Sequence, residues 1–406
     1  MRAFNKNLAH SFTCVICLLA SACGGGGGGG GGFGPSPLPS GPNVAPITVD
    51  SGPAGTVNTA FVSVTLCVPG TATCQTIDHV LVDTASSGLR IVAALLDSSL
   101  TLPPVADGAG NPLAECMQFA DGHSFGSLRL ADVKIASEQA SGIPVQIIGD
   151  PAFATVPADC SAIGPPEDTV QTLGANGILG ISVFREDCGA ACTGAAVSGA
   201  YYSCPATGCL SASVPLSSQA QNPVWHFAIN NNGSMVVLRG VDPAGAALVA
   251  GALVFGIDTQ SNNRLASANV LTVDPATGTF STLYRGQTLP ASFLDSGSNG
   301  LFFSDNLLPV CTGPTAPGFY CPTTVQSLSA TLQSSTGVSS SVAFRVANAE
   351  TLLANNATFV AFGNLAGTTT LSGTFDWGLP FFYGRSVYVA IEGQSTSSGL
   401  GPYFAY

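Results

Sequence analysis

Two aspartates stand at matched positions in two similar stretches of the chain. The first stretch reads HVLVDTASSGLRI around Asp83, and the second reads ASFLDSGSNGLFF around Asp295. The other matched pairs are Ser86/Ser298, Gly88/Gly300 and Leu89/Leu301, which are identical, and Thr84/Ser296 and Ala85/Gly297, which are close substitutes. The copies lie about half a chain length apart, which favours two similar halves over a short-period repeat.

Two carboxylates brought together from these stretches could perform acid–base chemistry. Like charges repel at short range, so a close pair holds one proton between its members near neutral pH. The ionised member could take a proton from a water molecule, and the protonated member could support the oxyanion that forms on a peptide carbonyl. This chemistry needs neither a metal nor a cofactor, and we expect none. A single D-T-x-S stretch is usually a turn or a cap, so the hypothesis depends on the duplication.

A second matched element follows each aspartate. The first is NGILGISVF at residues 176–184, and the second is DWGLPFF at residues 376–382. Aligning Gly180 with Gly378 also aligns Phe184 with Phe382. Both halves therefore show the same order: an apolar strand, the aspartate loop, a long β-rich insert and an apolar segment with a glycine.

This order resembles that of the pepsin-like aspartic peptidases. Residues 116–135 resemble the flap hairpin of that family, residues 223–242 its segment closing the first lobe, and residues 381–391 its last pair of strands. The resemblance implies a mainly β fold of two lobes, related by a pseudo-two-fold axis, with a cleft between them. We expect the lobes to span residues 48–242 and 243–406.

The resemblance also implies roles for the two loops. Asp83 and Asp295 would activate the water molecule that hydrolyses a peptide bond. The residues beside them would support the pair: Thr84 and Ser296 by bracing the opposite loop, Ser86 and Ser298 by hydrogen bonding to the carboxylates, and Gly297 as part of the second loop. The implied activity is that of an aspartic endopeptidase acting on extended polypeptide.

A flap would cover the pair and contact the substrate. The candidate residues of its tip are Phe119, Asp121, Gly122 and His123. Asp121-Gly122 is a favourable hairpin turn, and we expect His123 to be exposed to solvent.

Three features depart from the family pattern. Ala85 replaces the usual glycine of the first loop, Phe119 lacks the hydroxyl of the usual flap tyrosine, and Asp376 makes the second apolar segment irregular. These departures keep open a pepsin-fold binding protein without catalysis.

A serine esterase is a further alternative. Gly122-His123-Ser124-Phe125-Gly126 matches G-x-S-x-G, in which Ser124 would be the nucleophile. That motif requires a helix after the serine, but residues 127–135 alternate apolar and polar residues as a strand does.

Composition and cysteine content limit the class of protein. The net charge is −12, with 11 Lys+Arg, so we expect no nucleic-acid partner. Ten cysteines follow residue 23, an even number that favours disulfides in an oxidising compartment. The easiest pairs are Cys67 with Cys74, Cys204 with Cys209 and Cys311 with Cys321. A zinc site is the rival interpretation, but no C-x-x-C pair recurs and histidines are few.

The first 47 residues read as a leader and a tether. Residues 1–23 resemble a bacterial lipoprotein signal peptide that ends in Cys23, the residue that would carry the lipid. Residues 24–47 are rich in glycine and proline and predict a flexible linker. We therefore expect an exported monomer in the periplasm or at the outer membrane, attached to the membrane by an N-terminal lipid anchor only.

Overall fold

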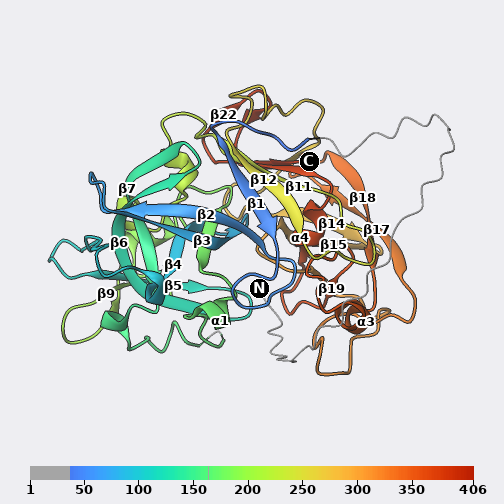
Figure 1. Ribbon diagram of the computed structural model, residues 1–406, viewed down its shortest axis with the longest axis horizontal. Coiled ribbons are helices and arrows are strands. Elements are labelled where there is room, and N and C mark those ends of the chain that lie inside the picture. The colour runs from blue at the N-terminus through green and yellow to red at the C-terminus, as the bar shows by residue number, and fades with distance from the viewer. Residues whose placement is uncertain (1–36, 163) are drawn as a thin grey trace, which may run out of the picture.

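The computed structural model describes residues 37–162 and 164–406. The predicted signal peptide, its Cys23 and residues 24–36 lie outside the described residues. Figure 1 shows strands β2 to β9 on one side, β14 to β19 on the other, and β1, β11 and β12 between them. The expected fold class is confirmed: the chain is mainly β and two-lobed.

The N-terminal lobe is formed by strands from the first half of the chain. Neighbouring strands are β10, β9, β5, β6, β7, β4, β8, β3 and β2, in that spatial order. Their bounds are β2 Ala60–Cys67, β3 Cys74–Asp83, β4 Ser87–Val92, β5 Leu113–Gln118, β6 His123–Ile135, β7 Glu138–Ile148, β8 Gly177–Ile181, β9 Tyr201–Ser203 and β10 Leu210–Ser211.

The C-terminal lobe has its own sheet, in the order β18, β17, β14, β15, β20, β16 and β19. Its strands are β14 Phe280–Tyr284, β15 Gln287–Leu294, β16 Leu301–Phe303, β17 Gln326–Gln333, β18 Ser339–Val346, β19 Ala366–Gly367 and β20 Phe375–Trp377. A small hairpin joins β22 Ser395–Thr396 to β23 Gly399–Leu400.

Strands from both ends of the chain form the layer between the lobes. Its order is β1, β12, β11, β21, β24 and β13, and β1 also pairs with β2 of the N-terminal lobe. The bounds are β1 Val44–Val49, β11 Gly233–Leu238, β12 Val249–Phe255, β13 Val270–Thr272, β21 Ser386–Ala390 and β24 Tyr403–Ala405.

The position of β1 corrects the predicted linker. Residues 44–47 belong to a strand that pairs along its whole length with β12. Its alternate residues Ala45, Ile47 and Val49 are buried, which is the period of a half-buried strand. The proline-rich composition around this segment concealed that alternation.

Helices in the described part of the chain are short. The α-helices are α1 Val170–Leu173, α2 Ala191–Gly194, α3 Ala349–Asn355 and α4 Leu379–Phe382, and the 3-10 helices are η1 Ala93–Leu95, η2 Pro151–Phe153, η3 Leu216–Ser218 and η4 Pro223–His226. Within residues 37–162 and 164–406, no helix has the length and apolar character needed to cross a membrane.

Each lobe repeats the same three-stranded arrangement around its aspartate. In the first lobe β3 lies parallel to β8, with Asp83 opposite Gly180, and β4 pairs antiparallel with β8. In the second lobe β15 lies parallel to β20, and β16 pairs antiparallel with β20. The two matched elements of the sequence are therefore neighbouring strands, as the pseudo-two-fold fold requires.

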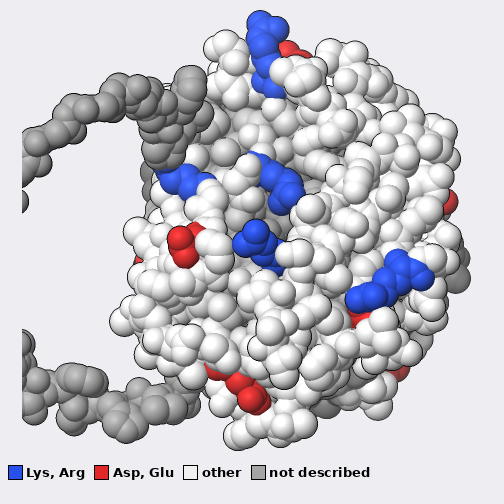
Figure 2. Space-filling model, turned by 90° about the vertical axis from the view of Figure 1, so that its right-hand side faces the viewer, with Lys and Arg blue, Asp and Glu red and all other residues white. Residues whose placement is uncertain are grey.

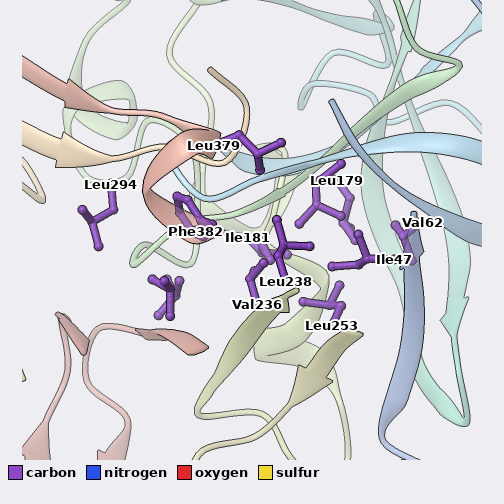
Figure 3. Packing of buried hydrophobic residues seen from close by; sticks show 14 of the residues in the cluster. Ile47, Val62, Leu179, Ile181, Val236, Leu238, Leu253, Leu294, Leu379 and Phe382 are labelled. Atoms are coloured by element: carbon purple, nitrogen blue, oxygen red, sulfur yellow. The ribbon is translucent and has the colours of Figure 1, made fainter. Parts of the chain in front are cut away.

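One apolar core joins the lobes to the layer between them. Its buried cluster includes Leu179 and Ile181 of β8, Leu238 of β11 and Leu294 of β15. Figure 3 shows Leu179 and Ile181 close to Leu238, beneath Leu379 of α4. The strands that end at the two aspartates thus rest on a shared, rigid base.

All ten cysteines of the described residues form disulfides. The three predicted pairs are confirmed, and the others are Cys116 with Cys160 and Cys188 with Cys192. This pairing leaves no thiolate in the described chain for the rival zinc site.

The surface carries few charges, as the composition predicts. Figure 2 shows the side of the molecule that lies at the right in Figure 1, where isolated basic and acidic residues interrupt a mostly uncharged surface.

Candidate active site

The two aspartate loops meet between the lobes. Asp83 is the last residue of β3, Asp295 directly follows β15, and their exposed fractions are 7% and 2%. Both line one pocket, together with Ala85 and Gly297. A methyl group on Gly297 would lie 3.0 Å from Oδ1 of Asp295 and 3.0 Å from Oδ1 of Asp83. The two carboxylates, far apart in sequence, therefore flank the same point in space.

Matched donors hold the two carboxylates. The backbone N–H of Ala85 donates to Oδ1 of Asp83 at 2.8 Å, and the hydroxyl of Ser86 donates to Oδ2 at 2.5 Å. In the second loop the N–H of Gly297 donates to Oδ1 of Asp295 at 2.7 Å, and Ser298 Oγ lies 2.8 Å from Oδ2. Each carboxylate is thus fixed by its own loop, with one oxygen on the backbone and the other on a serine.

Hydrogen bonds between the loops hold the two carboxylates beside each other. Thr84 Oγ1 donates to the carbonyl of Leu294 at 3.0 Å and accepts from the N–H of Ser296 at 3.0 Å. Ser296 Oγ donates to the carbonyl of Val82 at 2.7 Å. Thr84 and Ser296 are fully buried, so these bonds are shielded from water.

The glycines of the apolar segments allow the loops to pack closely. A Cβ on Gly180 would lie 2.8 Å from the carbonyl and hydroxyl oxygens of Ser86. A Cβ on Gly378 would lie 2.7 Å from the carbonyl of Ser298 and 2.0 Å from that of Gly300. Either substitution would push the aspartate loop out of place. Glycine is therefore required at both positions because there is no space for a side chain.

Ala85 fits the first loop without strain. Its backbone is not among the left-handed conformations that favour glycine, and its N–H makes the same bond as that of Gly297. Its side chain is exposed in the cleft. The loop therefore tolerates the extra methyl group of Ala85.

The electrostatics of the pair are asymmetric. Burial, followed by the nearby charge of Asp83, raises the pKa of the Asp295 carboxyl to about 7. The hydrogen bond from Ser298 and that from the Gly297 N–H act in the opposite direction. Near neutral pH the pair therefore retains a proton, with Asp295 as its acidic member.

The hairpin of β5 and β6, here called the flap, covers the aspartates. Its tip is residues 119–122, closed by a 2.8 Å bond from the Phe119 N–H to the Gly122 carbonyl. Phe119 lines the pocket that contains Asp83 and Asp295, and Asp121 lines a neighbouring pocket. A Cβ on Gly122 would lie 2.6 Å from the carbonyl oxygen of Pro165 and 2.9 Å from Oε1 of Glu167, so this residue packs against a loop outside the flap.

The prediction that His123 is exposed is wrong. Its exposed fraction is 3%, and its Nδ1 lies 2.9 Å from the carbonyl oxygen of Gly164. The backbone of His123 also bonds to Pro165 and Glu167. The sequence pattern did not reveal that residues 164–167 cover this side of the flap, which removes His123 from the substrate contacts.

Ser124 does not occupy a nucleophile elbow. It lies within strand β6, is fully buried, and is 3.3 Å from Oε1 of Gln146. No helix follows it, because β6 continues to Ile135. A buried hydroxyl inside a strand cannot reach an ester, so the esterase alternative fails on geometry.

Three connected pockets form a groove beneath the flap. The first contains the aspartates, the second reaches Phe184 and Phe404, and the third lies over Phe302 and Asp376 of the C-terminal lobe. Their volumes are about 140, 480 and 190 Å³. Because residues 119 and 120 line adjacent pockets, the groove passes under the flap tip as an extended chain would.

Residues 39–406 match the model of a family described as a protein of unknown function, DUF3443. The chain belongs to this family. One of the solved structures that match is the aspartic proteinase from Irpex lacteus, with 14% sequence identity and a TM-score of 0.50. The match covers 89% of this chain and 96% of that one. At this identity the likeness shows the pepsin-like fold alone. In sequence, none of the curated proteins matches the chain.

This DUF3443 chain places a third aspartate at the site. Asp376 lies on β20, is 3% exposed, and has its Oδ2 2.6 Å from the hydroxyl of Ser298. In the sequence Asp376 was only an irregularity of the second apolar segment. The signal that could have identified it is its alignment with Ile178, because an aspartate at a position that is apolar in the other half requires a partner.

We predict that Thr84→Val separates the two loops. Valine keeps the shape of threonine but leaves the Leu294 carbonyl and the Ser296 N–H without their buried partner. We expect a loss of about 2–3 kcal/mol in the free energy of unfolding, measured by urea titration. The matched control is Thr65→Val, which removes a hydroxyl bonded only to the exposed Thr76 and should cost less than about 0.5 kcal/mol. Equal losses in the two variants would contradict the role of Thr84.

Proposed function

We propose that this protein is an aspartic endopeptidase. The observation that carries the proposal is the meeting of Asp83 and Asp295, on matched loops, in one pocket beneath the flap. The pepsin-like fold supports a polypeptide as the substrate, and so do the adjacent pockets that share residues 119 and 120 of the flap tip beside the aspartates. The proposed substrate is an extended segment of an unfolded or flexible protein.

In the proposed reaction, the two aspartates share the work of acid and base. A water molecule would lie between them, and Asp83 would remove its proton as the oxygen attacks the peptide carbonyl. Asp295 would donate its proton to the developing oxyanion, since its raised pKa makes it the protonated member near neutral pH. The hydrogen bonds to Oδ1 and Oδ2 of each carboxylate would keep both groups aimed at that water.

A binding protein without catalysis is the second candidate. Phe119 is the observation that favours it, because it lines the aspartate pocket without offering a hydroxyl to the substrate or the water. The aspartates would then serve only to fix the loops, and the groove would hold a peptide without cleaving it.

We predict pepstatin-sensitive proteolysis by the purified protein. A denatured protein substrate should be cleaved between about pH 4 and pH 7, and Asp83→Asn or Asp295→Asn should reduce kcat/KM at least about 1,000-fold, because either change removes the acid–base pair. Cleavage is measured by mass spectrometry of the fragments. The control is Asp107→Asn, a partly exposed carboxylate that lines none of the three pockets, which should retain full activity. Pepstatin or peptide binding without fragments would support the binding protein instead.

The pH dependence follows from the raised pKa of Asp295. Above about pH 7 Asp295 loses its proton, so we expect kcat/KM to fall by about tenfold per pH unit on this alkaline side. The same shift makes folding stability decline as pH rises over a lower range, between the ordinary carboxyl pKa and about pH 7, because over that interval the folded protein holds a proton that the unfolded chain has lost; above about pH 7 this contribution is gone and the stability no longer changes with it. Initial rates should therefore be measured beside circular dichroism at each pH. A flat rate profile from pH 6 to pH 9 with the fold intact would contradict the assignment.

We propose further that the protein is an exported monomeric lipoprotein of the periplasm or outer membrane, anchored at Cys23. The leader pattern and the glycine-rich stretch after it support the anchor. The five disulfides support an oxidising compartment, because such bonds rarely persist in a reducing cytosol.

A separate prediction concerns the attachment of lipid to Cys23. Cys23→Ser should abolish incorporation of radiolabelled palmitate and move the protein from the membrane fraction to the soluble fraction, because the serine hydroxyl cannot accept the lipid. Cys17→Ser, a leader cysteine outside the predicted cleavage motif, is the matched control and should leave labelling unchanged. Labelling that persists in Cys23→Ser would contradict the anchor.

A further inference from the structure

The third aspartate occupies a position that is apolar in the other lobe. Asp376 lies opposite Phe293 of β15, and its counterpart Ile178 lies opposite Leu81 of β3. Ile178 lines the pocket that contains Asp83 and Asp295, and Asp376 lines the neighbouring pocket over the C-terminal lobe. The two halves therefore differ by a buried carboxyl group beside Asp295.

Ser298 lies between this carboxyl and Asp295. Its Oγ is 2.6 Å from Oδ2 of Asp376 and 2.8 Å from Oδ2 of Asp295. All three residues are nearly or fully buried. The corresponding Ser86 of the first loop lies 2.5 Å from Oδ2 of Asp83, with Ile178 in place of a second carboxyl.

The number of available protons limits how Ser298 can bond to both carboxyl groups. A serine hydroxyl carries one proton and can donate to only one of the two carboxyl oxygens. The other contact is a hydrogen bond only if that carboxyl is itself protonated and donates to Oγ. At distances of 2.6 and 2.8 Å both contacts are hydrogen bonds, so the chain needs a proton on Asp295 Oδ2 or on Asp376 Oδ2.

The surroundings place that proton on Asp376. Among the described residues, the titratable groups that face it are carboxyls: Asp295 and Asp83 from the two loops, and Asp121 from the flap tip across its pocket. Within the described residues, no Lys, Arg or His forms an ion pair with Asp376, and its buried Oδ1 has no hydrogen-bond partner. Burial and the neighbouring Asp295 accordingly raise its pKa well above the usual range. Burying an uncharged carboxyl at this site costs far less free energy than burying a carboxylate would.

We propose that Asp376 is a positioning residue that stays protonated and donates a hydrogen bond to Ser298 Oγ, so that the Ser298 hydroxyl donates its own hydrogen bond to Oδ2 of Asp295. This inference rests on the proposed peptidase function. With Oδ2 occupied as an acceptor, the proton of Asp295 is confined to Oδ1, the oxygen that faces Oδ1 of Asp83 across Gly297. Asp376 thus directs the acidic proton into the cleft and takes no part in its transfer.

Kinetics of four variants test the positioning role. Asp376→Asn keeps an uncharged donor and should retain kcat within about threefold. Asp376→Ile, which copies the first lobe, should lower kcat at least about tenfold, the size of one lost hydrogen bond to an ionisable group, with KM within about threefold. Ser298→Ala removes the hydroxyl itself and should lower kcat at least as much, and the double variant Asp376→Ile/Ser298→Ala should lose nothing beyond Ser298→Ala, because Asp376 acts only through Ser298. An unchanged kcat in Asp376→Ile, or additive losses, would overturn the role.

Proton release on unfolding tests the protonation state without using activity. At pH 6 Asp376 should hold a proton in the folded protein and lose it on unfolding, so Asp376→Asn should release one proton fewer than the natural chain. The control is Asp107→Asn: hydrogen bonds, first that from Ser203, lower the pKa of Asp107 to about 2, so the count should not change. An equal count in Asp376→Asn would overturn the proposal. This result stands even if the protein cleaves no peptide, which separates its failure from failure of the proposed function.

Discussion

The structure depends on the hydrogen bonds that tie one aspartate loop to the other. Two buried carboxylates that were both ionised would repel each other and would separate in a flexible setting. Thr84 and Ser296 prevent this, because each anchors its hydroxyl to the backbone of the opposite lobe. The interlobe strands and the common core then serve to keep these few bonds in register. The shared pocket follows from that enforced closeness, which also adds to the effect of burial in raising the pKa of Asp295.

Much of the fold was predictable because two similar halves of a sequence imply two halves of a structure with the same arrangement of strands. The matched stretches around Asp83 and Asp295 and the matched glycines 180 and 378 indicated two halves with the same order of elements, and the short-range cysteine pairs followed from proximity along the chain. The strand at residues 44–49 was missed because its proline and its glycine-rich approach hide an alternation of buried residues.

The details of the site were less predictable, because they depend on segments distant in sequence. His123 is buried only because residues 164–167 fold over the flap, and no local pattern encodes that contact. The role of Asp376 becomes apparent only from its contact with Ser298 in the structure. Sequence symmetry identifies the residues that the two halves share, whereas the chemistry specific to one half requires coordinates.

The disulfide between Cys116 and Cys160 restricts the movement of the flap over the cleft. It fastens strand β5 to the loop that also packs on His123 and Gly122, so the base and one flank of the flap are held to the N-terminal lobe. A hinged lifting of the whole hairpin would have to break this attachment. Under the proposed function, a polypeptide would then enter by bending of the short tip at residues 119–122, or by movement of the two lobes apart.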